Sequence, residues 1–342
     1  MSLKNLNAKK KIPKLFIDKL TNKRINQIYK KFEKYLNIDE NFIVAVSGGP
    51  DSLSLAFLAK IYSIKNNLVS KFFIVDHKLR KESTKEAKLV KKILKKNHIE
   101  ASILTWKGSK PIKKIQSLAR EKRFQLLFTE CEKYNIKNVL LGHHQDDLVE
   151  NFFIRMLRGS GLKGLISLDK RSEIDKKTLI RPLLNQKKKD LEFLSKQVFN
   201  FYVNDPSNKN EEFKRVRIRN FINELKKDGL DFSKFLNTIR NLQYSNSVVD
   251  FYVSENIKEN SYYSQKSNKT FVNNFFFQKP DEVIFRSLSS LIKIIGKKHN
   301  FVRGKKLSQT IKKIRENSFS KSTLGGCVLE KVNDTLIIEK EA

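Results

Sequence analysis

Short apolar runs alternate with segments of helical periodicity over the first two thirds of the chain, and this alternation constrains the fold more than any other feature. Phe42–Val46, for example, is a continuous apolar run, as expected for a strand that is buried on both faces. The expected strands are 42–46, 71–75, 101–106, 138–141 and 178–180. The expected helices are 22–36, 52–64, 82–97, 112–134, 145–157 and 187–198. Regular alternation of this kind predicts a parallel, doubly wound α/β sheet with right-handed crossovers.

The α/β pattern ends near residue 217, where a turn cluster at 205–208 is followed by a basic helix expected over 213–225. The remainder is expected to be mainly helical, with helices near 281–296 and 305–316, whereas residues 243–278 give only weak signals. The last part alternates well enough to predict a β-hairpin that joins 323–330 to 335–339. We therefore divide the chain into a lysine-rich arm (1–21), an α/β domain (22–217) and a C-terminal region (218–342).

The formal net charge is +34, with a pI near 10.0, which predicts a polyanionic partner such as nucleic acid. Part of the lysine excess also fits the composition of an AT-rich genome. Arginine is scarcer and is concentrated between Arg80 and Arg219, where the alternatives are anion binding and ordinary surface ion pairs. Cys131 and Cys327 form no metal or redox motif, and no apolar run is long enough for a signal or a membrane span. We therefore expect a cytoplasmic protein that has no membrane partner.

A glycine-containing loop directly follows the first expected strand and begins a helix. Its sequence is Ser47, Gly48, Gly49, Pro50, Asp51, Ser52. Backbone amides at such a junction favour a phosphate, the serine hydroxyls can donate to it, and Asp51 can help to hold Mg²⁺. The lysine of the GxxxxGK[ST] phosphate-binding loop is absent. The alternative interpretation is an ordinary strand-to-helix turn.

Imidazoles and carboxylates gather at a second strand-to-helix junction, formed by His143, His144, Asp146, Asp147 and Glu150. Asp146 and Glu150 are four residues apart, on one face of the expected helix. Mg²⁺ bound between substrate phosphates and Asp147 fits this set better than zinc does. In the alternative interpretation, Asp146 caps the helix and His143 packs in the core.

Gly159-Ser-Gly-Leu-Lys-Gly164 matches the GxGxxG dinucleotide pattern but follows a helix instead of a strand, so we interpret it as a loop near a substrate. Arg215, Arg217 and Arg219 alternate. In a helix, consecutive members of this series would point about 200° apart.

The first loop resembles the signature of the N-type ATP pyrophosphatases, or PP-loop enzymes, which cleave ATP between the α- and β-phosphates. Further segments resemble those of tRNA(Ile)-lysidine synthetases, in the same order along the chain: 75–80, 116–123, 142–147 with Glu150, 155–164, 181–184, 204–208 and the arginines at 215, 217 and 219. The resemblance covers roughly residues 40 to 220. It departs from the family pattern at Leu148-Val149 and Asn151, where the family has Gln-Ala and Thr.

The resemblance implies a reaction with two steps. ATP adenylates C2 of the wobble cytidine in tRNA(Ile) with a CAU anticodon, and the amine of free L-lysine then displaces AMP. The implied cofactors are ATP, as a substrate, and Mg²⁺, with Asp51 and Asp147 as metal ligands. The implied catalytic residues are Asp51, His144, Asp146, Asp147, Glu150 and Arg217. The residues implied to contact tRNA or nucleotide are Asp76, His77, Arg80, Arg120, Arg123, Arg155, Arg158, Arg181, Arg215 and Arg219.

Several points stay open at this stage. Asp146, Asp147 and Glu150 are equal candidates for orienting or deprotonating lysine. Arg217 can act at the active site or simply contact the tRNA backbone. The C-terminal region is expected to bind the tRNA body, and the oligomeric state is open, with a homodimer as one option. The alternative functions are a tRNA thiolase, disfavoured by the lack of paired cysteines, and a catalytically inactive nucleic-acid-binding protein.

Overall fold

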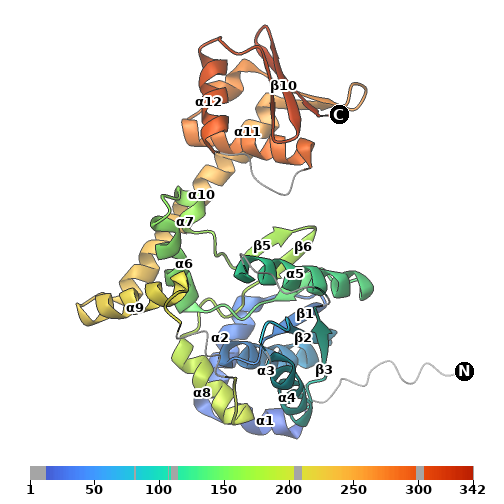
Figure 1. Ribbon diagram of the computed structural model, residues 1–342, viewed down its shortest axis with the longest axis vertical. Coiled ribbons are helices and arrows are strands. Elements are labelled where there is room, and N and C mark those ends of the chain that lie inside the picture. Colours follow the sequence, from blue (N-terminus) through green and yellow to red (C-terminus); the bar gives the residue numbers. More distant parts are fainter. Residues whose placement is uncertain are drawn as a thin grey trace, which may run out of the picture. The chain divides into compact units, whose positions relative to one another are not determined.

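A computed structural model describes residues 13–80, 82–106, 108, 115–203, 210–297 and 304–341 (Figure 1). Residues 1–12 of the predicted arm and the 204–208 segment therefore lie outside the described residues. The chain divides into two compact units, residues 1–237 and 238–342. No helix among the described residues is long and apolar enough to cross a membrane.

The first unit is built on a six-stranded sheet with the order β3-β2-β1-β4-β6-β5. Its strands are β1 (Phe42–Val46), β2 (Ser70–Asp76), β3 (Ala101–Thr105), β4 (Asn138–Leu140), β5 (Arg171–Ile174) and β6 (Lys177–Ile180). The central strand β1 is parallel to both neighbours, with Val44 paired to Phe72 on one side and to Leu140 on the other. The predicted α/β class with a parallel sheet is confirmed.

The predicted elements of this unit are present, with ends shifted by at most two residues; the predicted helix start at residue 112 lies outside the described residues. The helices are α1 (Lys14–Leu20), α2 (Lys23–Leu36), α3 (Pro50–Lys65), α4 (Ser83–Lys96), α5 (Ile115–Lys133), α6 (Gln145–Met156), α7 (Leu162–Leu165), α8 (Lys188–Phe199) and α9 (Lys214–Lys227). Two helices and one strand are additions. α1 lies within the predicted arm, where burial of Phe16 holds it on the core, and the short helix α7 begins within the segment that we interpret from the sequence as a loop. β5 pairs antiparallel with β6 through a turn at Asp175-Lys176, both with positive φ, and its residues are mostly exposed.

Two apolar layers cover the sheet, and residues of β1 alternate between them. Phe42 and Val44 join the core formed with α3, whereas Ile43 joins the core formed with α5, so these two helices lie on opposite faces (Figure 1). Eleven of the sixteen residues of α3 are buried. Because α3 is enclosed in this way, its N-terminus is held rigidly at the carboxyl edge of the sheet.

The first compact unit continues beyond the predicted boundary at residue 217. Val216, Ile218 and Ile222 bury one face of α9, which packs against α6. At the start of α10 (Phe232–Asn260), Phe235 stacks on Phe153 of α6, with 5.1 Å between the ring centroids. These contacts explain why the unit extends to Asn237.

The second unit combines helices with an antiparallel sheet of order β7-β8-β11-β10-β9. Its elements are the rest of α10, β7 (Ser261–Ser264), β8 (Lys269–Val272), the 3-10 helix η2 (Asn274–Gln278), α11 (Asp281–Gly296), α12 (Gly304–Arg315), β9 (Lys321–Leu324), β10 (Cys327–Val332) and β11 (Thr335–Lys340). The predicted hairpin is the pair β10 and β11. The strand expected over 323–330 is divided, because Gly325-Gly326, with φ of 65° and 82°, form a turn between β9 and β10.

Candidate active site

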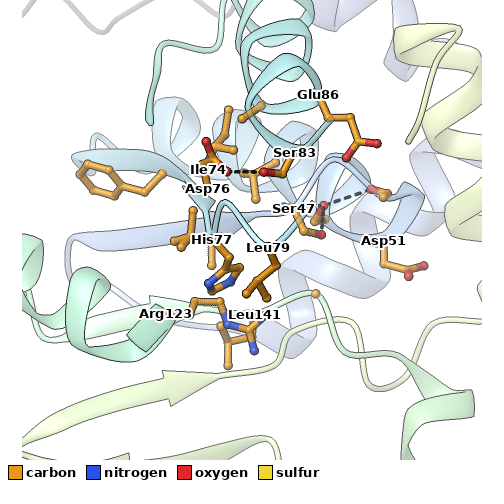
Figure 2. Close-up of a pocket in the computed structure, with 18 of the residues that line it drawn as sticks. Ser47, Asp51, Ile74, Asp76, His77, Leu79, Ser83, Glu86, Arg123 and Leu141 are labelled. Atoms are coloured by element: carbon orange, nitrogen blue, oxygen red, sulfur yellow. Dashed lines mark hydrogen bonds between the residues drawn. The ribbon is translucent and has the colours of Figure 1, made fainter. Parts of the chain in front are cut away.

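A cavity of about 420 Å³ opens at the carboxyl ends of β1, β2 and β4 (Figure 2). This volume is typical of small-molecule sites. Apolar side chains of the strands, such as Phe73 and Leu141, form one part of its wall. Polar residues from all three predicted strand ends also line it, namely Ser47, Asp51, Ser52, Asp76, His77, His143 and Asp147, together with Arg80, Ser83, Glu86 and Arg123. The edge of the sheet predicted to bind ligands is therefore hollow and polar.

The loop before α3 is held by the hydroxyl of Ser52. Ser52 Oγ accepts hydrogen bonds from the amides of Ser47 and Gly48, each at 3.1 Å, and donates to the carbonyl of Gly49 at 3.0 Å. The amides at 47 and 48, which we expected to face a phosphate, thus point to Ser52 Oγ. The amides of Asp51 and Ser52 lie in the first turn of α3, where a helix provides no partners of its own, so they are available to an anion.

Two glycines let the backbone segments approach closely. Gly48 has φ +88°, and a Cβ placed there would lie 2.6 Å from Val90 Cγ2. A Cβ at Gly142 would lie 3.3 Å from the backbone of Asp51 and Ser52. Gly142 therefore brings the segment from His143 to Glu150 directly against the loop formed by residues 47–52.

His144 is the N-cap of α6, in place of the Asp146 cap considered from the sequence. Its Nδ1 accepts the amide of Asp146 at 3.2 Å, and the Asp147 carboxylate accepts the amide of His144 at 3.0 Å. Because Nδ1 is an acceptor, a neutral His144 carries its proton on Nε2. That atom lies 3.6 Å from both Asp51 Oδ2 and Asp147 Oδ2, so His144 links the two predicted metal ligands.

Asp51 and Asp147 form a donor set that fits Mg²⁺. Asp51 Oδ1 is buried and has no hydrogen-bond partner among the described residues. Burial raises the pKa of Asp51 to about 6, and the charge of Asp147 adds to this effect, while His144 opposes it. The described chain holds no group of three or more His, Cys, Asp or Glu side chains placed around a metal. A bound Mg²⁺ would therefore need substrate oxygens as further ligands, which is its usual mode with phosphates.

His143 also lines the cavity, as a neutral imidazole. Burial is the main reason that its pKa falls to about 3; Asp147 opposes the shift, and Arg181, Arg120 and Arg123 strengthen it. Its Nδ1 is buried without a hydrogen-bond partner among the described residues. His143 thus faces a ligand site, in contrast to the core position considered from the sequence.

Four predicted contact arginines gather around this edge of the sheet. Burial and the charges of Arg120 and Arg215 lower the pKa of Arg123 to about 10, and burial with the charges of Arg215 and Arg155 lowers the pKa of Arg120. Arg123 lines the cavity, and its Nε has no partner among the described residues. Cations clustered in this way repel one another, and a polyanionic ligand would offset that repulsion.

The residues after β2 organise the cavity in different ways. Asp76 accepts hydrogen bonds from the Lys78 amide, Ser83 Oγ and Thr84 Oγ1, and these contacts outweigh burial and lower its pKa. Its carboxylate, predicted to contact a ligand, thus fixes the loop and the start of α4 (Figure 2). His77 faces the cavity, with its pKa lowered by burial and Arg123.

Of three further predicted arginines, one lines this cavity and two lie elsewhere. Arg80 lines it and forms an ion pair with Glu86 at 2.9 Å. Arg181 is buried and donates to the Asp169 carbonyl at 2.7 Å and to Ser172 Oγ at 3.0 Å, so it anchors the sheet edge. Arg158 is exposed after α6, where Gly159-Ser-Gly begins.

The arginines of α9 point to different sides, as expected for a helix. Arg219 donates to Glu150 Oε1 at 2.5 Å. Arg215 lies four residues before Arg219 and therefore on the same face of α9. Against the effect of burial, His144 and His143, and after them Arg215, lower the pKa of Asp147, so this face meets the carboxylates. Arg217, which we had chosen as the catalytic arginine, lies on the exposed opposite face and beside Phe221. The structure therefore brings Arg219, not Arg217, to the acidic residues.

A second hollow, of about 300 Å³, lies beside the first turns of α6, and we call it the acidic hollow. It is named after its carboxylates, Asp146, Glu150 and Glu192, but four cations line it as well, namely Lys188, Lys189, Arg219 and Lys226. Ile222, Asn223 and Phe232 complete the lining. Burial raises the pKa of Glu150, whose Oε2 has no partner among the described residues. Sequence reasoning missed the residues of α8. The only signal for them was the charged start of that helix, which packing against α3 brings to the site.

The comparisons agree with this geometry. A family model for the PP-loop domain matches residues 18–226. A tRNA(Ile)-lysidine synthase of Orientia tsutsugamushi is 33% identical over 310 residues, which cover 87% of this chain and 69% of the relative. The enzyme of that name from Wolbachia pipientis wMel is 30% identical, over 87% of this chain and 70% of the relative. A U34-tRNA thiolase from Methanococcus maripaludis shares the fold, with a TM-score of 0.55 and 19% identity over 65% of this chain and 78% of that one. The chain is an ATP-binding PP-loop enzyme and belongs to the tRNA(Ile)-lysidine synthase family.

Proposed function

We propose that this enzyme adenylates C2 of the wobble cytidine of tRNA(Ile) with a CAU anticodon and then attaches free lysine to give lysidine. One observation carries the proposal. In the first turns of α6, Asp147 lines the 420 Å³ cavity at the carboxyl ends of the strands. Glu150, three residues further along the helix, lines the acidic hollow. The two hollows thus adjoin a single set of carboxylates. This arrangement suits a reaction between an activated nucleotide and lysine, whose ε-amine is bound as a cation and must then be deprotonated.

In the first step, the C2 oxygen of cytidine forms a bond to the α-phosphorus of ATP, and the bond between the α- and β-phosphates breaks to release pyrophosphate. The amides at the start of α3 and the Arg120–Arg123 group bind the phosphates in this proposal. Asp51 and Asp147 would hold Mg²⁺, which neutralises developing phosphate charge. Nε2 of His144 lies 3.6 Å from a carboxylate oxygen of each aspartate, and the His144 amide donates to Asp147.

In the second step, the ε-amine of lysine attacks C2, and the bond from C2 to the oxygen that carries AMP breaks. In this proposal Asp146, Glu192 and the Oε2 atom of Glu150 bind the lysine cation, while Lys188, Lys189 and Lys226 can pair with its α-carboxylate. The amine must lose a proton before it attacks. Glu150 is the best-placed base, because its Oε2 is unpartnered and its raised pKa lies closer to neutrality.

The test is to incubate the protein with ATP, labelled lysine and transcripts that carry the CAU anticodon in isoleucine or methionine tRNA bodies. Label should enter the isoleucine body only. Incorporation into neither refutes the ligase activity, incorporation into both refutes tRNA discrimination, and tRNA binding without any turnover favours an inactive binding protein.

Two variants separate the steps. Asp51→Ala should abolish pyrophosphate release and retain tRNA binding, so unchanged turnover would refute its role. Glu150→Gln should still release pyrophosphate from ATP in the presence of tRNA while lysine incorporation falls. Glu224→Gln is the matched control, since Glu224 is an exposed carboxylate on α9. Equal loss of both steps in Glu150→Gln would argue against a role specific to lysine.

A further inference from the structure

A third hollow, of about 390 Å³, lies on the first compact unit between the end of α6 and α9, two neighbouring helices (Figure 1). Leu157, Lys214, Arg217, Ile218 and Phe221 line it, and we call it the aromatic hollow. Leu157 is 59% exposed and Phe221 is 43% exposed. Large apolar side chains with this exposure form a surface that the described residues of the first unit do not cover.

The ring of Phe221 is held in place from behind. Phe153 contacts it edge to face, with 5.7 Å between the centroids, and Phe153 in turn stacks on Phe235 at 5.1 Å. Ile218, only 5% exposed, anchors the same part of α9 in the core. A supported ring that is partly exposed is suited to stack on a flat ligand, because little side-chain freedom is lost on binding.

The rim of the aromatic hollow is cationic. Lys214 and Arg217 line it, none of the five lining residues is acidic, and neither cation has an ion-pair partner within the described part of the chain. Charge complementarity therefore favours a ligand that has a flat apolar group between anionic groups. An unstacked RNA base with its flanking phosphates has this chemistry, and the net charge of +34 favours the same partner.

We propose that the aromatic hollow binds an unpaired base of the tRNA anticodon loop, stacked on Phe221, with its phosphates at Lys214 and Arg217. This inference rests on the proposed function, because that function brings the anticodon loop to the enzyme. Arg219 faces Glu150, and Phe221, two residues further along α9, faces the other side. The hollow is thus about 10 Å from the acidic residues, the width of one helix. A nucleotide near the wobble position can occupy it while the wobble base enters the active site.

The experiment uses the full chain and tRNA(Ile) transcripts in which 2-aminopurine replaces single anticodon-loop bases other than the wobble base. Stacking on Phe221 should quench the fluorescence at one position in the wild type. Phe221→Ala should abolish this quenching and weaken tRNA binding about tenfold, and Phe221→Trp should restore both. Leu157→Asp places a carboxylate at an exposed position and should also weaken binding. Arg217→Ala should reduce the salt dependence of log Kd by about 0.7.

Tyr134→Ala is the matched control. Tyr134 is 39% exposed, is supported by Phe73 at 6.3 Å and lies near Lys71 and Lys133, but it follows α5 at the amino edge of the sheet. It should bind tRNA as the wild type does. Equal losses in Tyr134→Ala and Phe221→Ala would overturn the proposal, because they would indicate a non-specific basic surface.

Further outcomes distinguish stacking on Phe221 from the alternatives. Wild-type quenching and affinity in both Phe221→Ala and Leu157→Asp would overturn the proposal, and the circular dichroism spectrum of each variant identifies any that fails to fold. Loss of self-association with unchanged tRNA affinity would identify a second copy of the chain as the occupant. If lysine incorporation is seen but Phe221 has no effect, only this inference fails. If the fluorescence of 2-aminopurine is quenched in a way that depends on Phe221 but no lysine is incorporated, only the proposed function fails.

Discussion

Replacing Arg219 with alanine would leave the buried carboxylate of Glu150 without its cation. Removing one partner of a buried ion pair costs about 3–5 kcal/mol. The Arg219 side chain is 32% exposed, so water can partly replace it, and we expect a loss of about 2–3 kcal/mol. For a unit of this size, each kcal/mol lowers Tm by roughly 2–4 °C, so Tm should fall by roughly 4–12 °C.

The loss should depend on pH in a defined direction. Burial already raises the pKa of Glu150, and Arg219 opposes that shift, so its removal raises the pKa further. A carboxyl group with a raised pKa favours the folded state when protonated, and this advantage disappears as the pH rises from the unfolded value, near 4.3, through the folded value. Arg219→Ala should therefore lose less stability at pH 5 than at pH 8.

The assay is thermal unfolding of four proteins at both pH values: the wild type, Arg219→Ala, Glu150→Gln and the double variant. Glu150→Gln removes the charge, so the double variant should recover most of the loss at pH 8. Arg217→Ala is the control, because Arg217 is exposed on the other side of α9, and it should change stability by less than about 0.5 kcal/mol. An Arg219→Ala loss equal to that control, or one that Glu150→Gln does not relieve, would refute the reasoning.

Further predictions concern the loop, the second strand end and the thiols. Gly48→Ala should abolish ATP binding, measured by calorimetry, because a Cβ would meet Val90 at 2.6 Å in a backbone with φ +88°; normal affinity would contradict the loop geometry. The lowered pKa of Asp76 stabilises the folded state above the unfolded pKa, near 3.9, and this stabilisation is lost as the pH falls through the folded pKa. Asp76→Asn should therefore remove the part of the acid denaturation that protonation of Asp76 causes. An unchanged acid transition would argue against this contribution. Cys131 is buried, and burial raises its pKa to about 11. It should therefore resist Ellman's reagent at pH 8 until the protein is denatured, and rapid labelling in the native protein would show that the thiol is accessible.

The sheet was predictable because its central strands are buried on both faces and therefore appear in the sequence as continuous apolar runs. β1 is predicted with its observed ends, Phe42–Val46. β5 was missed for the opposite reason: Arg171–Ile174 is polar, lies at the sheet edge and leaves only a turn at Asp175-Lys176 as a signal. The 29-residue α10 was missed because Asn and Ser recur along it, and residues that favour caps and turns hide the helical periodicity.

The candidate site was predictable where strand ends place residues, and less so where helix faces do. Parallel strands bring Ser47, Asp76 and His143 to one edge whatever the loops do, so their proximity follows from topology alone. The choice among Arg215, Arg217 and Arg219 depends instead on the rotation of α9 about its axis. That rotation is set by which side is buried, here Val216, Ile218 and Ile222, and by the packing of α9 on α6. A sequence that alternates arginines with apolar residues does not fix the rotation.

The distribution of charge connects the fold with the proposed chemistry. Beyond the effect of burial, the charge of Arg215 lowers the pKa of both Arg120 and Arg123, and a short distance away the charge of Asp147 raises the pKa of Asp51. Like charges thus repel within each group, although His144, His143 and Arg215 favour the charged form of Asp147. A polyphosphate satisfies the arginines, and a cation satisfies the carboxylates. Because ATP with Mg²⁺ brings both charges together, its binding would relieve both repulsions at once, whereas either component alone would relieve only one. We therefore propose that the site is complementary to the complex of ATP with Mg²⁺ more than to either component alone.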